Sequence, residues 1–385
     1  MQIEILYDVP VSSNFPANVQ GVMCAYPLST KLTDGTVAVV YRQGETKHSY
    51  DGILMIQLSE DGGRSWSMPQ TVANGLLEVP TQTVVTGGIC QVPSGVLLAV
   101  YGTVEGLPPS VYPFSPEASA CARHVVMVRS DDLGVTWSEP ERLDLSTLGR
   151  AGITSGPFVA ANGTVCIPIE NKLPTGNNAT ALVISHDDGQ TFGPPITVAA
   201  DHTGQLNLCD ARFDLLPNGR VISLLWTFLQ ENEVTIEAHQ AFSDDNGLTW
   251  SKPENIGCVG QITVPLALSN GRVIAVSNYR HSPMGTLLWF SEDGGESWMV
   301  DQPILLWDAE KRMMAGKPVT IEPPKAVGEQ VWDELQRFSF GTPDLVLLDD
   351  ETVLLTYYAT LSCGREENQS IEDVVHIRAC RFRML

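Results

Sequence analysis

Apolar and β-branched residues recur along the chain in short runs that tight turns separate. In the first such stretch, PLSTKL (27–32) alternates weakly, TDG (33–35) is a turn signal, and TVAVVYR (36–42) is a β-branched apolar run. A polar loop follows, and then a third run, ILMIQLS (53–59). This order predicts an antiparallel unit of strand, turn, strand, loop and strand.

The same unit occurs six times in the chain. The later copies read ICQV–PSG–VLLAVY with HVVMVRS, FVA–ANG–TVCIPI with ALVIS, FDLL–PNG–RVISLLW with HQAFS, PLAL–SNG–RVIAVS with LLWFS, and DLVLL–DDE–TVLLTYY with VVHIRACRF. A fourth strand should follow, as in PQTVA or PITVA, and the N-terminal QIEILYD should complete the last unit. Strand-rich repeats of about 40–60 residues are typical of propeller blades. We predict an all-β fold, a six-bladed β-propeller, with residues 1–385 as one domain.

An eight-residue motif, S-x-D-x-G-x-[ST]-[WF], follows the third run of five units. Its copies begin at Ser59, Ser130, Ser185, Ser243 and Ser291. The motif resembles the Asp-box of the sialidase (BNR-repeat) superfamily, which joins the third and fourth strands of a blade. In such a turn the aspartate accepts backbone hydrogen bonds, the glycine supplies a positive φ, and the aromatic ring packs between blades. We therefore expect a structural role, and no catalytic or metal-binding role, for Asp61, Asp132, Asp187, Asp245 and Asp293.

The charge balance limits the kind of partner. Lysine and arginine number 23 against 45 aspartates and glutamates, which gives a formal net charge of −22 and a pI near 4.6. Nucleic acid requires a basic face, so we do not expect it as a partner. An anionic substrate would need a local basic pocket to overcome the negative field of the whole protein.

The cysteines and the N-terminus give expectations about cofactors and compartment. The eight cysteines form no C-x-x-C pair and several lie in apolar runs, so we expect buried free thiols and neither a metal nor another cofactor. The N-terminal MQIEILYDVP resembles no secretory signal, and no apolar run approaches the ~20 residues of a membrane span. These features predict a cytoplasmic protein that does not bind membranes, and they leave the oligomeric state open.

The hairpin order predicts which end of the propeller carries the chemistry. The turns such as TDG and the Asp-boxes fall on one face, while the loops between second and third strands and the crossings between blades fall on the other. Several of these segments are long, namely residues 43–52, 103–123, 171–179, 229–235 and 307–340. Long segments that meet at one end of a rigid scaffold commonly carry function.

The resemblance to sialidases implies a set of active-site positions. The superfamily acid corresponds to Asp51, 24 residues after Pro27, and a second-strand arginine corresponds to Arg42. A further carboxylate position is occupied by Asp210, nine residues before a turn glycine. One arginine of the triad that binds the substrate carboxylate corresponds to Arg280.

Other positions differ from the superfamily pattern. The two remaining triad arginines correspond to Ala25 and Trp226. The glutamate that orients the first arginine corresponds to Tyr358, and the nucleophilic tyrosine corresponds to Thr342. One arginine binds a carboxylate less strongly than three do. A standard tyrosine-dependent sialidase is therefore not expected.

Of the superfamily's active-site groups, this sequence keeps two carboxylates, Asp51 and Asp210. Glycoside hydrolysis requires such a pair of carboxylates. We predict Asp51 as the acid, Asp210 as the base or nucleophile activator, and His281 as a proton carrier. Glu170 and Glu231 lie on the same face and could replace either aspartate. The predicted substrate-binding residues are Arg42, Arg212, Trp226, Gln261 and Arg280.

The predicted function is hydrolysis of the glycosidic bond of an acidic or sialic-acid-like sugar. Two alternatives stay open. One is a polysaccharide lyase on the same fold, whose base would be His281, Tyr279, Tyr357 or Tyr358. The other is a non-catalytic carbohydrate-binding propeller, which would tolerate the loss of both aspartates.

Overall fold

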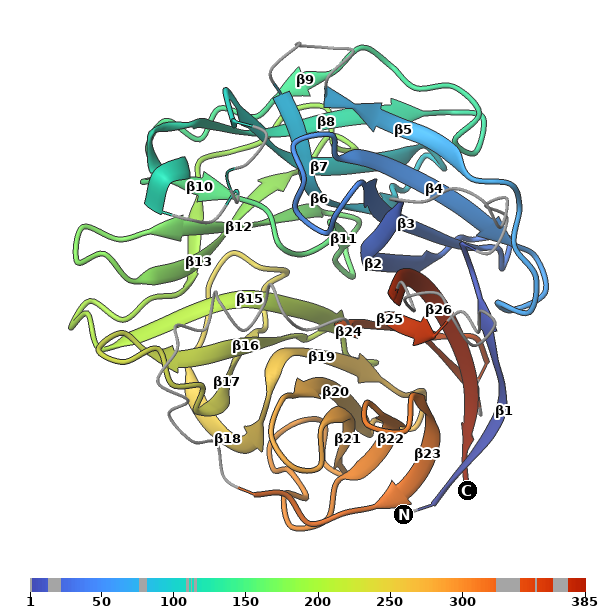
Figure 1. Ribbon diagram of the computed structural model, residues 1–385. Coiled ribbons are helices and arrows are strands. Elements are labelled where there is room, and N and C mark those ends of the chain that lie inside the picture. The colour runs from blue at the N-terminus through green and yellow to red at the C-terminus, as the bar shows by residue number, and fades with distance from the viewer. Residues whose placement is uncertain are drawn as a thin grey trace.

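Six small β-sheets form a ring (Figure 1). Neighbouring strands within every sheet are antiparallel, as the hairpin pattern predicts. The predicted all-β, six-bladed propeller is therefore confirmed. The computed structural model describes residues 2–12, 22–75, 82–108, 111, 113, 116–322, 340–349, 352–362 and 373–385.

The first three blades follow the chain from residue 23 to residue 199. The first contains β2 (Met23–Lys31), β3 (Val37–Gly44), β4 (Ile53–Ser59) and β5 (Gln70–Asn74). The second contains β6 (Gln82–Gln91), β7 (Leu97–Glu105), the short 3-10 helix η1 (Pro116–Ala120), β8 (Ala122–Ser130) and β9 (Glu141–Arg142). The third contains β10 (Ala151–Gly152), β11 (Phe158–Val159), β12 (Val165–Lys172), β13 (Asn178–Ser185) and β14 (Ile196–Ala199). Both β10 and β11 pair with β12, so the inner strand of this blade is in two pieces.

The other three blades complete the ring. The fourth contains β15 (Leu206–Leu215), β16 (Val221–Leu229), β17 (Glu237–Ser243) and β18 (Glu254–Val259). The fifth contains β19 (Gln261–Ala267), β20 (Val273–Tyr279), β21 (Gly285–Ser291), β22 (Ile304–Asp308) and an additional outer strand, β23 (Met313–Pro318). The sixth contains β24 (Phe340–Leu347), β25 (Thr352–Ser362), β26 (Asp373–Met384) and β1 (Ile3–Pro10).

The N-terminal strand closes the ring. It pairs antiparallel with β26, so strands from the two ends of the chain lie side by side (Figure 1). Asp8 on β1 accepts hydrogen bonds from Arg378 Nε at 3.0 Å, from Arg378 Nη2 at 2.7 Å and from Tyr357 OH at 3.1 Å. The expected completion of the last blade by the N-terminal run is confirmed.

The repeated turns share one hydrogen-bond pattern. In the fourth copy, Asp245 Oδ1 accepts from Ser243 Oγ at 2.9 Å and from Thr249 N at 2.8 Å, and Oδ2 accepts from Thr249 Oγ1 at 2.6 Å. Gly247 has a φ of +92° and donates its N–H to Ser243 Oγ. The same contacts recur around Asp61, Asp132, Asp187 and Asp293. These aspartates form the turns, as the motif predicts.

The apolar runs pack between adjacent blades. One buried cluster joins Leu28 and Val40 of the first blade to Ile89 of the second. After the fifth Asp-box, Trp298 Nε1 donates to Gln240 Oε1 of the fourth blade at 3.0 Å. Burial of such side chains is the main stabilising term for each blade, which has little interior of its own.

The described cysteines and helices bear on two predictions from the sequence, buried free thiols and the lack of a membrane span. Seven of the cysteines are described, and all of them are free thiols; six are buried and Cys121 is partly exposed. Cys363 lies outside the described residues. Within the described ranges, no helix has the length and apolar character needed to cross a membrane.

Candidate active site

A pocket on the ring axis, which we call the axial pocket, receives side chains from all six blades. Its walls come from the starts of the inner strands, the ends of the second strands and the loops beside them, which is the end of each blade opposite the Asp-box. The face predicted to carry the chemistry therefore holds this pocket. Its lining residues are Tyr26, His48, Val85, Thr86, Thr154, Glu170, Asp210, Arg212, Trp226, Gln261, Ile262, Arg280, Thr342 and Tyr358.

The inner strands are bulged where they line the axial pocket. Strand register shifts at this level in β2, β6, β15, β19 and β24. Four residues in these bulges have positive φ angles, namely Tyr26 (60°), Asp210 (47°), Ile262 (54°) and Thr342 (40°). Such conformations are strained for residues other than glycine, and they cluster at functional sites. The bulges therefore mark this end of the ring as a candidate active site.

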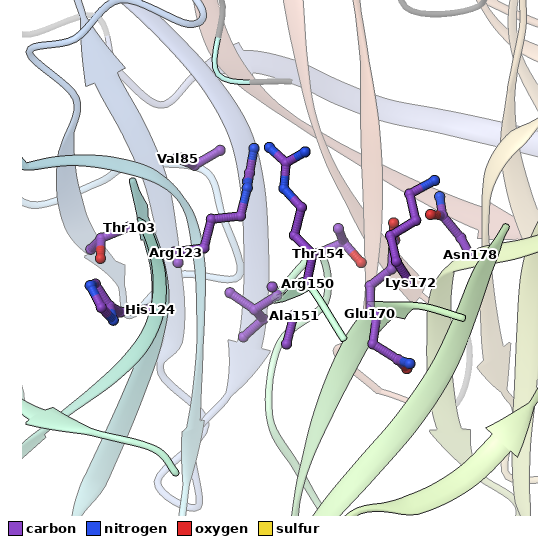
Figure 2. Close-up of a pocket in the computed structure, with 14 residues that line it drawn as sticks. Val85, Thr103, Arg123, His124, Arg150, Ala151, Thr154, Glu170, Lys172 and Asn178 are labelled. Carbon is purple, nitrogen blue, oxygen red and sulfur yellow. The ribbon is translucent and has the colours of Figure 1, made fainter. Parts of the chain in front are cut away.

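A second pocket, which we call the side pocket, opens beside the axial pocket between the second and third blades (Figure 2). The two pockets share Val85, Thr154 and Glu170. Because of these shared walls, a ligand longer than one sugar ring could extend from the first pocket into the second.

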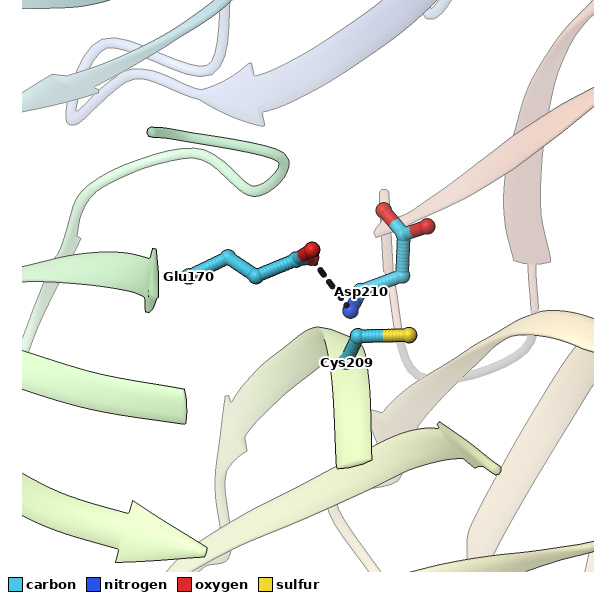
Figure 3. A group of neighbouring side chains, drawn as sticks. All are labelled: Glu170, Cys209 and Asp210. Atoms are coloured by element: carbon cyan, nitrogen blue, oxygen red, sulfur yellow. Dashed lines mark hydrogen bonds between the residues drawn. The ribbon is translucent and has the colours of Figure 1, made fainter. Parts of the chain in front are cut away.

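Two carboxyl groups meet in the axial pocket (Figure 3). Asp210 N donates to Glu170 Oε2 at 3.2 Å, and an oxygen of each carboxyl group lies within 4.8 Å of the other. Burial and the neighbouring charge of Asp210 raise the pKa of Glu170 to about 7, and burial also raises the pKa of Asp210. The pair therefore retains a proton near neutral pH, as a general acid must.

Cys209 lies next to this pair and completes the one group of three potential metal ligands found among the described residues. Its thiol is buried and lies 3.7 Å from Trp226 O, and burial raises its pKa well above the usual range. A protonated thiol is a poor metal ligand. The contacts are those of a carboxyl pair beside a packed thiol.

Arg212 adjoins the carboxyl pair. Its side chain is buried, and Nη1 lies 3.8 Å from Asp210 Oδ1. Its Nε and Nη2 have no protein hydrogen-bond partner within the described part of the chain. Buried donors left unpaired are costly, so these two groups favour an acceptor from a ligand or water in the pocket.

Tyr26 and His48 come from the first blade, which lies across the ring from the blade that carries Asp210. Tyr26 OH lies 2.7 Å from His48 Nε2. Burial, together with the positive charges of Lys47 and Arg42, lowers the pKa of His48 well below its usual range, so the imidazole is neutral. A neutral imidazole can accept a proton from the phenol.

Arg280 places a positive charge in the wall formed by the fifth and sixth blades. Its Nε donates to Gln261 Oε1 at 2.7 Å, and its Nη1 donates to Phe340 O at 3.1 Å. Lys47 Nζ lies 5.7 Å from the centre of the Tyr358 ring, and burial together with the charge of Arg280 lowers the pKa of Lys47 to about 7. A wall of this kind suits an anionic group on a ligand.

Comparison with protein families identifies the chain. A model described as BNR repeat-like domain matches residues 111–354, which is more than half of the sequence. The chain belongs to this family. Its Asp-box units are the repeats that place it in the sialidase-like superfamily.

Relatives of this BNR-repeat chain include sialidases. A sialidase of Clostridium perfringens is 23% identical over 300 residues, which cover 70% of this chain and 73% of that protein. Among solved structures, a protein of unknown function from Dyadobacter fermentans has a TM-score of 0.71 at 18% identity, with all of both chains covered. The intramolecular trans-sialidase from Ruminococcus gnavus, in complex with oseltamivir carboxylate, has a TM-score of 0.62 at 12% identity, with 97% of each chain covered. At these identities the structural matches show the fold.

Five of the eight predicted site residues line the axial pocket of this BNR-repeat propeller, and Arg42, Asp51 and His281 do not. Arg42 is 1% exposed, and its Nε and Nη1 donate to Val84 O at 3.0 Å and to Thr46 O at 2.7 Å. Asp51 Oδ2 accepts from Glu45 N at 3.0 Å. These contacts shape the loop between β3 and β4. The five residues that line the pocket are Asp210, Arg212, Trp226, Gln261 and Arg280.

Two other predicted residues have surroundings that define what they can do. His281 lies beside Tyr279, with ring centres 5.6 Å apart, and is not part of the axial-pocket lining. Trp226 is 1% exposed, and its Nε1 donates to Thr235 Oγ1 at 3.2 Å. Trp226 therefore serves as an apolar wall of the pocket and not as an open surface on which a sugar could stack.

Tyr26 and His48 are pocket residues that were not predicted from the sequence. Tyr26 directly follows Ala25, the position compared with the first superfamily arginine, and the bulge in β2 brings Tyr26 to the pocket. His48 lies in the loop of residues 43–52, which the hairpin order had placed on the active face. The Tyr-Pro dipeptide at residues 26–27 was the available signal for an irregular backbone in this strand.

Proposed function

We propose that the chain is a glycoside hydrolase that removes an acidic or sialic-acid-like sugar by carboxylate acid–base catalysis. The observation that carries this proposal is the Glu170–Asp210 pair, buried in a pocket that also contains arginines. The sialidase relative and the family repeats support the same class of reaction. The proposed substrate is a carbohydrate, and the proposed reaction uses no cofactor.

The chemistry follows from the proton that the pair retains near neutral pH. Glycosidic bond cleavage requires an acid that protonates the leaving oxygen and a carboxylate that activates water or a nucleophile. Glu170, with a pKa near 7, is a suitable acid, and Asp210, next to Arg212, is the better candidate for the ionised partner. This assignment moves the acid from the predicted Asp51 to Glu170, because Glu170 lines the axial pocket.

The positive groups support an acidic sugar. Arg280 and Arg212 both line the axial pocket, and Lys47 lies behind Tyr358 in the same wall as Arg280. In a chain with a net charge of −22, cations gathered around one pocket provide the local positive field that an anionic substrate needs. Arg212 thus adds a second arginine to a pocket that lacks two of the triad arginines.

The test is a hydrolysis screen with four proteins. Wild type, Glu170→Gln, Asp210→Asn and Asp51→Asn are assayed against aryl glycosides of sialic acids, uronic acids and neutral sugars, and then against the matching natural disaccharide. We expect release of an acidic sugar by wild type and a loss of about 10²- to 10⁴-fold in kcat for Asp210→Asn. Glu170→Gln should lose more activity on the disaccharide than on the aryl glycoside, since a good leaving group needs less help from an acid.

The other outcomes each reject part of the proposal. Loss of activity in Asp51→Asn with full activity in Glu170→Gln would return the acid role to Asp51. If no protein releases any sugar, and wild type and variants bind carbohydrate equally, the chain is a carbohydrate-binding propeller.

A lyase is the second candidate, and the Tyr26–His48 contact favours it. A phenol 2.7 Å from a neutral imidazole is a plausible base for removing the proton next to a uronic acid carboxylate. A lyase product contains a new carbon–carbon double bond conjugated to that carboxylate, whereas a hydrolase product does not. Ultraviolet absorbance of the products therefore separates the two reactions, and Tyr26→Phe should abolish only the lyase.

A further inference from the structure

The side pocket collects positive charge. Arg123, Arg150 and Lys172 line it, and Figure 2 shows their side chains extending to the same side of the pocket. They come from three separate segments, namely β8, the turn before β10 and the end of β12. A folded chain with a net charge of −22 has brought three cations together beside its candidate active site.

Glu170 lines the same pocket and partly compensates the charge of Lys172. Arg150 donates to Ala118 O at 3.2 Å, and neither Arg150 nor Lys172 is within salt-bridge distance of a carboxylate among the described residues. Glu105, the nearest paired acid in the second blade, contacts His124 at 3.1 Å and Arg142 at 3.5 Å. Burial is the main cause that lowers the pKa of Lys172, and the charge of Arg150 lowers it further, while the charges of Glu170 and Glu233 act in the opposite direction. An anion near Arg150 and Lys172 would be attracted by both cations.

A second observation points to a ligand. Thr103 lines the same pocket, is 1% exposed, and its Oγ1 has no hydrogen-bond partner within the described residues. A buried hydroxyl without a partner costs free energy unless a ligand or water pairs with it. The side pocket therefore combines cations and an unpaired hydroxyl, a set of groups suited to the oxygen atoms of an anion.

We propose that the side pocket is a subsite for an anionic group, a carboxylate or a sulfate, on the sugar unit that leaves when the glycosidic bond is cut. This inference rests on the proposed hydrolase function and narrows its substrate to oligosaccharides with acidic groups on two successive units. Glu170 lies in the wall shared by both pockets, so the group proposed to protonate the leaving oxygen borders the subsite that receives the leaving unit. The negative field of the whole protein would otherwise disfavour such a doubly charged substrate.

The experiment compares substrates that differ only in the leaving unit. Disaccharides with the same acidic sugar to be released, and with a neutral, a carboxylated or a sulfated leaving unit, are assayed with wild type, Arg150→Gln, Lys172→Gln and the control Lys252→Gln. Lys252 is an exposed lysine just after the fourth Asp-box, on the opposite face. The measured quantity is the ratio of kcat/KM for an anionic leaving unit to kcat/KM for the neutral one.

We expect this ratio to fall by about tenfold or more in Arg150→Gln and Lys172→Gln, since a charge-assisted hydrogen bond has about this effect, and to stay at the wild-type value in the control. The carboxylated and sulfated substrates show which anion the subsite takes. A ratio that is equal in all four proteins overturns the proposal.

A binding arm separates failure of this inference from failure of the hydrolase. Calorimetric titration of the same disaccharides into wild type and Lys172→Gln needs no turnover. Tighter binding of an anionic disaccharide to wild type than to the variant supports the subsite even if no bond is cut. Equal binding of neutral and anionic disaccharides by both proteins rejects it.

Discussion

At the scale of single residues, the chemistry of Glu170 depends on its neighbours. Neither Glu170 nor Asp210 would hold a proton at neutral pH in water. Burial and the charge of Asp210 raise the pKa of Glu170 from 4.5 to about 7. The folded chain therefore binds a proton that the unfolded chain releases, and this contribution to the free energy of unfolding falls as pH rises from about 4.5 to about 7.

Replacing Glu170 by glutamine should therefore stabilise the protein at high pH while it reduces catalysis. At pH 8 we expect the free energy of unfolding of Glu170→Gln to exceed that of wild type by about 1–3 kcal/mol, because the variant has no buried carboxylate to ionise. Near pH 4.5 the difference should vanish. Urea denaturation at both pH values measures it, and a difference independent of pH would contradict the raised pKa.

The sequence predicted only some of the residues that meet in the axial pocket. Asp210 could be found because it lies nine residues before a turn glycine, and Arg280 because it lies just after an apolar strand run. Tyr26 could not be found, because a bulge changes which side chain faces the axis and nothing in the hydrophobic pattern records it. Arg42 was expected at the site, but carbonyl groups of Thr46 and Ser49 in the loop after β3, together with Val84 O of β6, accept its guanidinium hydrogen bonds.

At the scale of elements, the blades were predictable because their signals are local. Each hairpin turn and each Asp-box determines its own contacts within a few residues. The divided inner strand of the third blade was not predicted, and Gly156 and Pro157 lie in the interval between β10 and β11. The outer strand β23 was also missed, because its pairing with β22 depends on a turn after Asp308 for which no repeat exists.

The Asp-box turn offers a test at this scale. In Asp245→Asn, the amide nitrogen that replaces one oxygen can no longer accept the hydrogen bond from Thr249 or Ser243. We expect a loss of about 1–2 kcal/mol in the free energy of unfolding and unchanged activity, because the axial pocket is at the other end of the blade. Denaturant titration measures the loss.

The adjacent residue provides the control for that test. Asp244 is exposed and pairs with Arg220 at 3.2 Å on the surface, so Asp244→Asn should change stability by less than about 1 kcal/mol. Equal denaturation midpoints for the two variants would show that the Asp-box aspartate has no special role in the turn.

At the scale of the whole molecule, closure of the ring depends on contacts between β1 and the sixth blade. The Asp8–Arg378 pair is mostly buried, with side chains 18% and 11% exposed, so removing one partner leaves the other charge poorly compensated. We expect Asp8→Asn to lower the free energy of unfolding by about 2–4 kcal/mol. Glu4→Gln is the control on the same strand, since Glu4 forms an exposed pair with Arg383 at 3.8 Å. Thermal unfolding of both variants that gave the same Tm would contradict this account.

Two buried carboxyl groups also connect neighbouring blades of the ring. Asp214 accepts from Ala267 N of the fifth blade at 2.5 Å, and Asp344 accepts from Ser29 N of the first blade at 2.6 Å. Burial raises the pKa of each to about 6 from 3.8. The folded state therefore binds these protons more tightly, and their contribution to stability is lost as pH rises through about 6.

We therefore expect the Tm of wild type to decrease between pH 5 and pH 7. His48 and His239 act in the opposite direction, because their lowered pKa values make the folded state less stable below their usual value of 6.5, but three carboxyl groups outweigh two imidazoles. Lys47, whose pKa is lowered to about 7, also opposes the decrease, but only above pH 7. Asp344→Asn should show a shallower decrease than wild type in differential scanning calorimetry. An identical slope would mean that Asp344 is ionised throughout this range.

The pairing of β1 with β26 also determines when the protein can finish folding in the cell. A ribosome makes β1 before the strands of the other blades, and its partner β26 is complete only after residue 384. At ordinary elongation rates of about 5–20 residues per second, the interval is about 20–75 s. During that time five blades can form one after another behind the ribosome, while β1 exposes an unpaired edge that other nascent chains could join. The synthesis of β26 is thus the step that protects β1 from aggregation.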